Sequence, residues 1–338
     1  MNKVIKWICI VCGAIFVLGF AAIGIGSFLG GKLFGYAFDI GSKKLYTSEN
    51  MVENTVDIEA FDELNVDADM SNVFVKIGKD NKVSYKLPEE LTPEITQEGK
   101  KLTITSKKKT TFDFMMGYSQ TQYIIIEVNE KGLKNLNINL ASGDISIEEL
   151  DIDGRLKTSS GDIYITGCEA GKNVDVKASS GSIEVIDSNF ESFNHKQSSG
   201  NTKIENMEAK KVTMSQSSGS SKVDSLKADT LESKVNSGSY IISNSKVNDA
   251  NISSTSGDID ADKLSCDKLY LHATSGDIDL GIVGAEDEFN YSVKATSGSV
   301  KVGATSVAKK YEKDNGSDKS ITVDVTAGDV NIGFVAAD

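Results

Sequence analysis

The feature that most constrains this chain is a corner of small residues that returns about every nineteen residues from Leu133 onward. Each corner is a Ser-Gly or Ala-Gly pair, and successive glycines are 18, 20, 19, 19, 19, 19, 19, 22 and 30 residues apart. A fixed period of this length is typical of a solenoid, in which each repeat forms one coil stacked on the last. The corner glycines are Gly143, Gly161, Gly181, Gly200, Gly219, Gly238, Gly257, Gly276, Gly298 and Gly328.

Apolar and polar residues alternate on both sides of each corner. The second and fourth residues after the glycine are mostly Ile, Val or Leu, as in Ile145 and Ile147, and the fifth residue before it is mostly apolar. A period of two predicts β-strands with one buried face. Hairpins would reverse direction and would not need the same corner in every repeat. The sequence therefore predicts an all-β fold, a parallel right-handed β-helix whose coils stack in chain order at about 4.8 Å each.

Glycine suits such a corner because a residue without Cβ can turn the chain tightly. The small hydroxyl residues before it can bond the turning backbone. No proline follows Pro93, which fits a chain whose N–H groups are almost all needed in hydrogen-bond ladders.

The N-terminal region predicts a membrane anchor. Residues 7–31 carry no charge, and about twenty apolar residues suffice to span a bilayer as a helix. A cleaved signal peptide is the alternative, but the run is long and lacks a good small-x-small cleavage site. Lys3 and Lys6 precede the run, which favours a cytoplasmic N-terminus and an extracellular C-terminal domain at the plasma membrane.

The sequence divides into four parts. Residues 1–31 form the cytoplasmic tip and anchor, and residues 32–56 read as a juxtamembrane linker. Residues 57–132 contain irregularly spaced β-like runs and predict a capping domain, which would cover the open edge of the first coil. Residues 133–338 form the solenoid, and the polar stretch from Lys309 to Lys319 is expected to bulge out and help close its last coil.

Composition argues against several functions. The formal net charge is -13, and Arg155 is the only arginine, so nucleic-acid binding is not expected. Cys168 and Cys266 would lie five coils apart, too far for a disulfide. His195 and His272 would lie four coils apart and cannot form a joint site. No catalytic motif and no cofactor-binding motif appears, so we expect a protein that is not an enzyme.

Four aspartates form the one acidic cluster of interest. Asp258, Asp260, Asp277 and Asp279 would occupy matching positions on two adjacent coils and form a rectangle of roughly 5 by 7 Å. Such oxygens could bind Ca²⁺. The alternative is a ladder at the corners, because the residue after each glycine is Asp, Ser or Asn, and these side chains accept backbone N–H groups at turns.

Polar residues also occur at inward positions of the middle coils. Gln197 and Gln216 share one position in adjacent coils, with Thr202 and Ser221 nearby. Stacked amides can bond one another along a solenoid, so we expect a glutamine stack and a more polar core there.

The phrase Ser-Gly-Asp-Ile-x-Ile at residues 142–147 and 160–165, its variants at residues 256–260 and 275–280, and Ala-Gly-Asp-Val-Asn-Ile at residues 327–332 resemble the bacterial β-strand-repeat "putative adhesin" family, a domain of unknown function. The resemblance covers about residues 58–334. It implies a β-helical fold and, in some members from Gram-positive bacteria, a membrane-anchored accessory role in cell-envelope stress systems. It supplies no catalytic residues.

These observations favour a membrane-anchored cell-surface protein, an adhesin or interaction protein whose partner on the surface or envelope is unknown. An accessory role in envelope stress is one alternative. A polysaccharide-active β-helix enzyme is another, for which only the four aspartates could serve.

Overall fold

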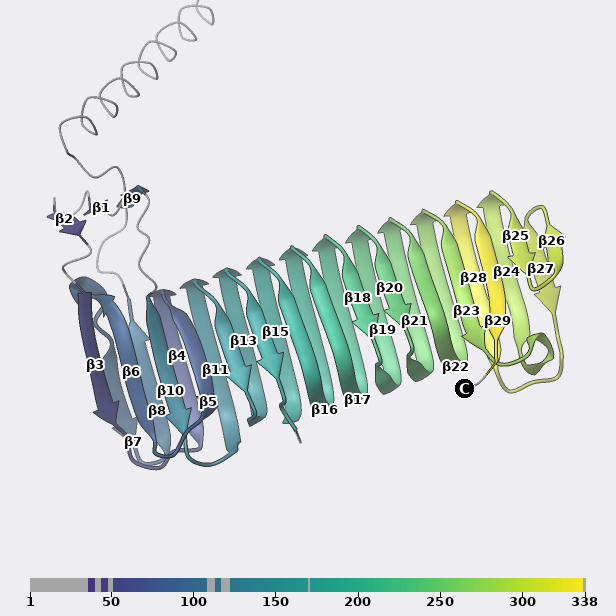
Figure 1. Cartoon of the computed structure of the whole chain (residues 1–338). Coiled ribbons are helices and arrows are strands. Elements are labelled where there is room, and N and C mark those ends of the chain that lie inside the picture. Colours follow the sequence, from purple (N-terminus) through teal and green to yellow (C-terminus); the bar gives the residue numbers. More distant parts are fainter. Residues whose placement is uncertain are drawn as a thin grey trace, which may run out of the picture.

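The computed structural model describes residues 36–39, 44–47, 51–107, 113–116, 122–169 and 171–336. Most of them form a rod of stacked strands (Figure 1). No helix in these ranges is long and apolar enough to span a bilayer. The anchor predicted for residues 7–31 lies outside the described residues.

Each coil of the rod has a long leg before its corner and a short leg after it, and we name a coil by its corner residue. Both legs pair in parallel with the same legs of the neighbouring coils. In β16, β17 and β22, one continuous strand contains the short leg of one coil and the long leg of the next. The strands of the coils are β4 (Glu63–Met70), β5 (Asn72–Ile77), β8 (Lys101–Ser106), β10 (Tyr123–Val128), β11 (Gly132–Ser142), β12 (Ile145–Glu148), β13 (Asp151–Ser160), β14 (Ile163–Thr166), β15 (Gly171–Ser180), β16 (Ile183–Ser199), β17 (Thr202–Ser218), β18 (Ser221–Asp224), β19 (Lys227–Ser237), β20 (Tyr240–Ser243), β21 (Lys246–Ser256), β22 (Ile259–Ser275), β23 (Ile278–Val283), β24 (Asn290–Ser297), β25 (Val300–Val302), β28 (Ser320–Ala327) and β29 (Val330–Val335).

A second corner follows the short leg and was not expected from the sequence. The sixth residue after the glycine has a positive φ in seven coils, although only Gly167 among these residues is a glycine. Asn and Asp tolerate this left-handed conformation better than other residues with a Cβ. Because the residue type varies, no repeated letter marks this corner in the sequence. The residues are Glu149, Gly167, Asp187, Asn206, Ser225, Asn244 and Lys263.

The solenoid begins well before the predicted boundary at residue 133. Strand β4 pairs in parallel with β11, and β5 pairs in parallel with β12. Ser71 and Asn72 take the place of the Gly-Asp corner, since the N–H of Asp144 donates to Asn72 Oδ1 at 3.0 Å. The predicted capping domain over residues 57–132 is therefore wrong in part, because a corner without glycine hid this coil.

Coils at the N-terminal end do not follow chain order. Strand β4 lies between β8 and β11, and β5 lies between β10 and β12. The coil formed by β8 and β10 comes later in the sequence, yet it lies farther out on the rod than the coil formed by β4 and β5.

The C-terminal end shows the same exchange. Strand β28 pairs with β22 on one side and β24 on the other, and β29 lies between β23 and β25. The Gly328 coil therefore stands between the Gly276 and Gly298 coils (Figure 1). Stacking in chain order is wrong at both ends. At each end, the coil nearest the chain terminus pairs with a coil on each side of it. The outermost coil comes from a more internal part of the sequence.

Antiparallel strands close both ends of the rod. At the N-terminal end, β6 (Lys82–Pro88) pairs with β10, β7 (Glu94–Glu98) with β8, and β3 (Met51–Asp57) with β6. At the other end, β26 (Thr305–Val307) pairs with β25 and β27 (Lys310–Lys313) with β24. The expectation that the stretch from Lys309 to Lys319 helps close the last coil is confirmed. These strands cover the edges of the outermost parallel strands, and uncovered strand edges are sites of aggregation.

The predicted linker over residues 32–56 contains β-strands. Strand β3 belongs to the large sheet, while β1 (Tyr36–Asp39), β2 (Lys44–Thr47) and β9 (Asp113–Met116) form a separate antiparallel sheet. Beside the strands, the described residues contain only two short 3-10 helices, η2 (Glu89–Leu91) and η3 (Glu286–Glu288).

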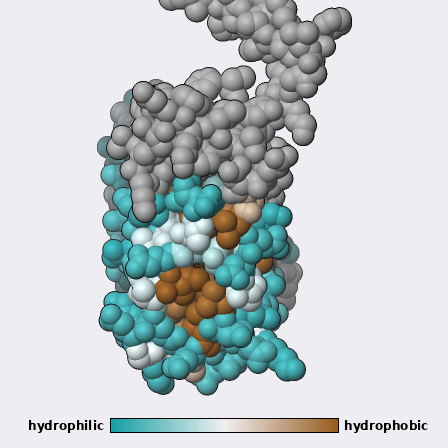
Figure 2. All heavy atoms as spheres, turned by 90° about the vertical axis from the view of Figure 1, so that its left-hand side faces the viewer, coloured by the Kyte–Doolittle hydropathy of each residue, from teal (hydrophilic) through white to brown (hydrophobic). Residues whose placement is uncertain are grey.

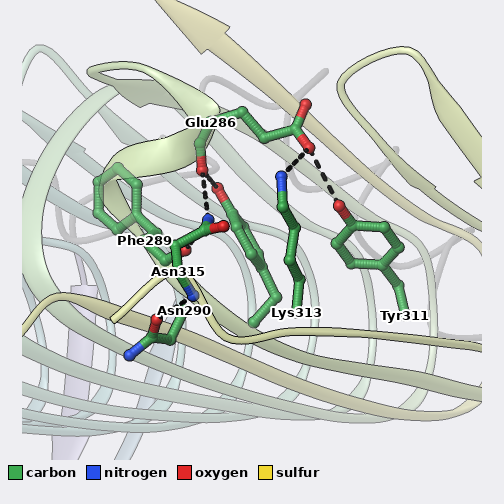
Figure 3. A network of polar contacts seen from close by, with 7 residues as sticks. Glu286, Phe289, Asn290, Tyr311, Lys313 and Asn315 are labelled. Carbon is green, nitrogen blue, oxygen red and sulfur yellow. Dashed lines mark hydrogen bonds and ion pairs between the residues drawn. The ribbon is translucent and has the colours of Figure 1, made fainter. Parts of the chain in front are cut away.

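A polar network stabilises the C-terminal closure (Figure 3). The Glu286 carboxylate accepts hydrogen bonds from Tyr311 Oη at 3.0 Å and Lys313 Nζ at 3.4 Å. Asn290 Oδ1 accepts the backbone N–H of Asn315 at 2.8 Å, and Asn315 Nδ2 donates to the Phe289 carbonyl at 2.7 Å. These bonds fasten the loop that follows β27 to the outermost coil.

One continuous hydrophobic core runs from Phe61 to Ile332 along the axis of the rod. At the N-terminal end, Val52 and Ile95 on the closing strands are partly buried and pack against this core. Figure 2, which faces this end, shows an apolar patch surrounded by hydrophilic residues.

Candidate functional site

The outer surface of the long legs is a regular surface that extends along the rod. We call it the long face, and it is formed by the outward side chains six and four residues before each corner. Equivalent residues lie side by side on neighbouring coils, and several pairs bond across coils. Asn137 Nδ2 donates to Asn65 Oδ1 at 2.7 Å, and Asn139 Nδ2 donates to Asp67 Oδ1 at 2.8 Å.

Two shallow grooves follow this face. One, of about 700 Å³, is lined by Arg155, Lys157, Lys177, Lys196, Lys211 and Glu232 among others. A second, of about 650 Å³, shares Lys211 and Glu232 with the first and extends to Tyr270. Tyr270 is unusual for an aromatic residue because 45% of it is exposed. The two grooves together form one surface that follows the axis of the rod.

Three lysines form a column in the first groove. Lys157, Lys177 and Lys196 each stand four residues before a corner, and they pair in register across β13, β15 and β16. We call them the lysine column. The sequence analysis missed them, although aligning the repeats on their glycines places all three at one position.

The predicted corner residues are confirmed as corners. The ten glycines have φ values between +111° and +147°. A second reason for glycine appears in the stacking. A Cβ on Gly219 would lie 1.9 Å from the carbonyl oxygen of Gly200, and the other corners show the same close approach to the neighbouring coil. Each coil therefore stacks directly on its neighbour's corner carbonyl.

The four predicted aspartates do come together on adjacent coils, but as a ladder. Asp260 and Asp279 pair in register, and Asp258 Oδ1 accepts the backbone N–H of Asp277 at 2.9 Å. Asp277 Oδ1 accepts the N–H of Asp329 at 2.8 Å. In the same way, Asp144 Oδ1 accepts the backbone N–H of Asp162 on the next coil. The turn-ladder interpretation is therefore confirmed, and its hydrogen bonds join neighbouring coils.

The ladder engages one carboxylate oxygen of Asp258 and one of Asp277 with backbone N–H groups. Within the described ranges, no group of three or more His, Cys, Asp or Glu side chains is arranged to hold a metal ion. Burial, with the nearby carboxylates of Asp279 and Asp262, raises the pKa of Asp260. Asp279 Oδ1 accepts a hydrogen bond from Asn331 Nδ2 at 2.9 Å.

The inward polar residues satisfy the corners and do not form the expected glutamine stack. Gln216 Nε2 donates to the carbonyl of Gly200 at 2.7 Å, and Gln197 does the same to Gly181. Thr202 Oγ1 donates to Gln197 Oε1 at 2.6 Å. The prediction of a stack is wrong, because each amide nitrogen donates to the corner carbonyl of the neighbouring coil instead of to the other amide. The more polar core of the middle coils is confirmed.

Three other candidate groups, His195, Cys168 and Cys266, are buried. His195 lies in the core, and burial lowers its pKa to about 4. Cys168 and Cys266 are free and buried. Burial raises the pKa of the Cys168 thiol to about 11 and that of Cys266 to about 12, so both remain protonated at neutral pH.

Comparison with known proteins identifies a family. A family model described as Toastrack DUF4097 matches the chain twice, over residues 61–194 and 172–333. Together the two matches cover the coils from β4 to β29. None of the curated proteins matches the chain.

The chain is also similar to solved structures. A "putative lipid binding protein" from Parabacteroides distasonis is 17% identical with a TM-score of 0.39, and the match covers 86% of this chain and 96% of that one. A "putative adhesin" from Parabacteroides merdae is 12% identical with a TM-score of 0.35, covering 85% and 97%. A "putative cell adhesion protein" from Clostridium sporogenes is 15% identical with a TM-score of 0.23, covering 84% and 100%.

Proposed function

The chain belongs to the Toastrack DUF4097 family, and we propose that it is a membrane-anchored β-solenoid that presents its long face to a component of the cell surface. It acts as an adhesin or a related interaction protein and has no catalytic activity. The observation that carries this proposal is the long face itself. Its outward side chains stand in register along the rod and offer a repeated, mostly polar surface to an extended partner.

The anchor in this proposal is the uncharged run over residues 7–31. A run of this length suffices to cross a bilayer. Lys3 and Lys6 favour retention of the N-terminus in the cytoplasm, which would put the solenoid outside the plasma membrane. Protease added to intact cells should then degrade the solenoid. Protection of the solenoid until the cells are lysed would contradict this orientation.

A surface role also suits the chemistry of the face. The side chains there bond one another across coils, as Asn194 Nδ2 does with Asp175 Oδ1 at 2.9 Å.

His195 lies in the core, while His272 lies four coils away on the long face. A general acid and base need to reach one substrate atom, and these two side chains cannot do so together.

Co-sedimentation with envelope fragments tests the proposal. The full chain should sediment with isolated cell-envelope fragments in a saturable manner, and excess unlabelled chain should displace it. An unrelated membrane-anchored protein of the same net charge is the control. Retention no greater than that of the control would refute the proposal.

The competing polysaccharide-active enzyme is tested separately. The full chain should release no new reducing ends from pectin, alginate or peptidoglycan. Turnover that is lost in Asp277→Asn would overturn the non-catalytic assignment.

A further inference from the structure

The lysine column combines three like charges at one position of three consecutive coils. Lys157 lies opposite Lys177, and Lys177 lies opposite Lys196. Neighbouring parallel strands are about 4.8 Å apart, so the column extends about 10 Å along the axis of the rod. Like charges directly opposite each other on neighbouring strands are destabilising. An anion bound along the column would relieve this repulsion.

Other lysines, on the Gly200, Gly219 and Gly238 coils, form ion pairs. Lys203 contacts Glu184 at 3.0 Å and Glu205 at 2.8 Å, Lys210 contacts Glu191 at 2.9 Å, and Lys227 contacts Glu208 at 2.7 Å. In the part of the chain that the structure describes, the three ammonium groups of the lysine column have no ion pair and no hydrogen bond. Lys157 is attracted over a longer distance by Asp67, two coils away. The contrast separates this column from the ordinary charge pairs of the surface.

The surroundings of the column are also positive. The groove that contains it holds five basic side chains and only two acidic ones, Asp175 and Glu232, a local balance of +3 in a chain whose net charge is -13. Arg155 contacts Asp175 only at 3.8 Å. The Debye length is about 8 Å at physiological ionic strength, so a ligand on the groove responds to this patch more than to the net charge of the chain.

Hydroxyl groups accompany the charges. Two residues after each lysine of the column stands a serine, on the same side of its strand because side chains alternate along a strand. These residues are Ser159, Ser179 and Ser198, none of which is buried. Their O–H groups can donate hydrogen bonds to anionic oxygens beside the ammonium groups.

We propose that the lysine column binds a linear polyanion, a polymer with one anionic group per repeat, laid along the axis of the rod. This inference rests on the proposed surface-binding function and names the chemistry of the partner. Three equal cationic positions on a line fit a polymer better than a single small anion. Lysine suits this task because its ammonium is a point charge on a flexible stem, which adapts to anionic groups of varying spacing.

Binding of long-chain inorganic polyphosphate to the full chain tests the proposal. Fluorescence anisotropy with end-labelled polyphosphate gives Kd at 50 mM and 200 mM salt. The triple variant Lys157→Gln/Lys177→Gln/Lys196→Gln should weaken binding at least about tenfold at the lower salt. If three contacts release counterions as a single-stranded polyanion does, log K should fall with log salt with a slope of about -2 in the wild type, and the slope should flatten in this variant.

The matched control removes the same number of charges from paired positions. Lys203→Gln/Lys210→Gln/Lys227→Gln should change Kd less than about twofold. Equal weakening in both triple variants would overturn the proposal, because binding would then follow net charge alone. Circular dichroism and a melting curve establish that each variant is folded. The column variant should melt close to the wild type, since it loses the repulsion among the lysines and a long-range attraction of Lys157 to Asp67.

Two further outcomes would also overturn it. Inorganic phosphate that competes as well as polyphosphate at equal phosphate concentration would indicate a single-anion site. Binding to vesicles containing phosphatidylglycerol, without binding to polyphosphate, would indicate a membrane surface instead. If envelope fragments still retain the wild-type chain when polyphosphate does not bind, this inference fails while the proposed function stands. If neither is bound, both fail.

Discussion

Lowering the pH should destabilise the solenoid through His195. This side chain is 1% exposed on β16, with Nε2 2.8 Å from Thr202 Oγ1. Its Nδ1 has no hydrogen-bond partner among the described residues. Burial lowers the pKa of His195 from 6.5 to about 4, and Gln197 opposes this only in part. The folded state therefore holds the ring neutral, while the unfolded chain protonates it near pH 6.5.

The sign and size of the effect follow from linkage. Between pH 6.5 and pH 4 the unfolded state binds more protons than the folded state, so the free energy of unfolding falls as the pH falls. The His195 contribution is intact above pH 6.5. From these two pKa values, about 2 kcal/mol should be lost between pH 7.5 and pH 5, and about 3 kcal/mol in total below pH 4.

His195→Met isolates this contribution from that of the carboxylates. Methionine fits because Met214 occupies the same position on the next coil, and Thr202 keeps its hydrogen bond to Gln197. Urea unfolding of the full chain, followed by far-ultraviolet circular dichroism, gives the stability at pH 7.5 and pH 5. The wild type should lose about 2 kcal/mol more than the variant. Equal pH dependence, within about 0.5 kcal/mol, would refute the assignment of a buried neutral histidine.

Three other predictions test the stacking and the aspartate ladder. Gly219→Ala should lower the free energy of unfolding by about 3 kcal/mol, because its Cβ would meet the Gly200 carbonyl. Gly132→Ala is the control and should be nearly neutral, because its Cβ meets nothing within 4 Å. Equal urea midpoints for the two variants would contradict the stacked-corner geometry. Deleting residues 320–338 should lower the melting temperature by more than 10 °C and increase aggregation, because it unpairs both β22 and β24; an unchanged melting curve with a monomeric elution profile would argue against the inserted coil. Millimolar Ca²⁺ should leave the melting temperature unchanged, since Asp277 Oδ1 is engaged by a backbone N–H, and a rise that Asp277→Asn abolishes would restore the cation site.

The repeat itself was readable from the sequence because its causes are local. A corner needs glycine to turn, as at Gly143, and alternation at Ile145 and Ile147 fixes which side chains face the core. The same local reasoning predicted that the side chain after each glycine accepts a backbone N–H at the corner. It also indicated that the stretch from Lys309 to Lys319 would leave the coil.

Only part of the candidate site could be predicted from the sequence. The positions of Lys157, Lys177 and Lys196 follow from the period, so their alignment was visible in the sequence. Whether a lysine is paired was not visible, because Lys203 and Lys210 occupy coils of the same design and yet contact glutamates on a neighbouring coil. Only the structure shows which charges are neutralised.

The sequence by itself determined the fold class, the period, the glycine corner and the inward positions, because each depends on residues close together in the chain. Tertiary structure alone decided the order of the coils at the two ends, the coil that turns at Ser71 without glycine, and the acceptors of Gln197 and Gln216. These depend on competition between distant strands for equivalent sheet edges and carbonyl groups. Every coil offers nearly the same edge, so the local pattern cannot say which one a terminal strand will join.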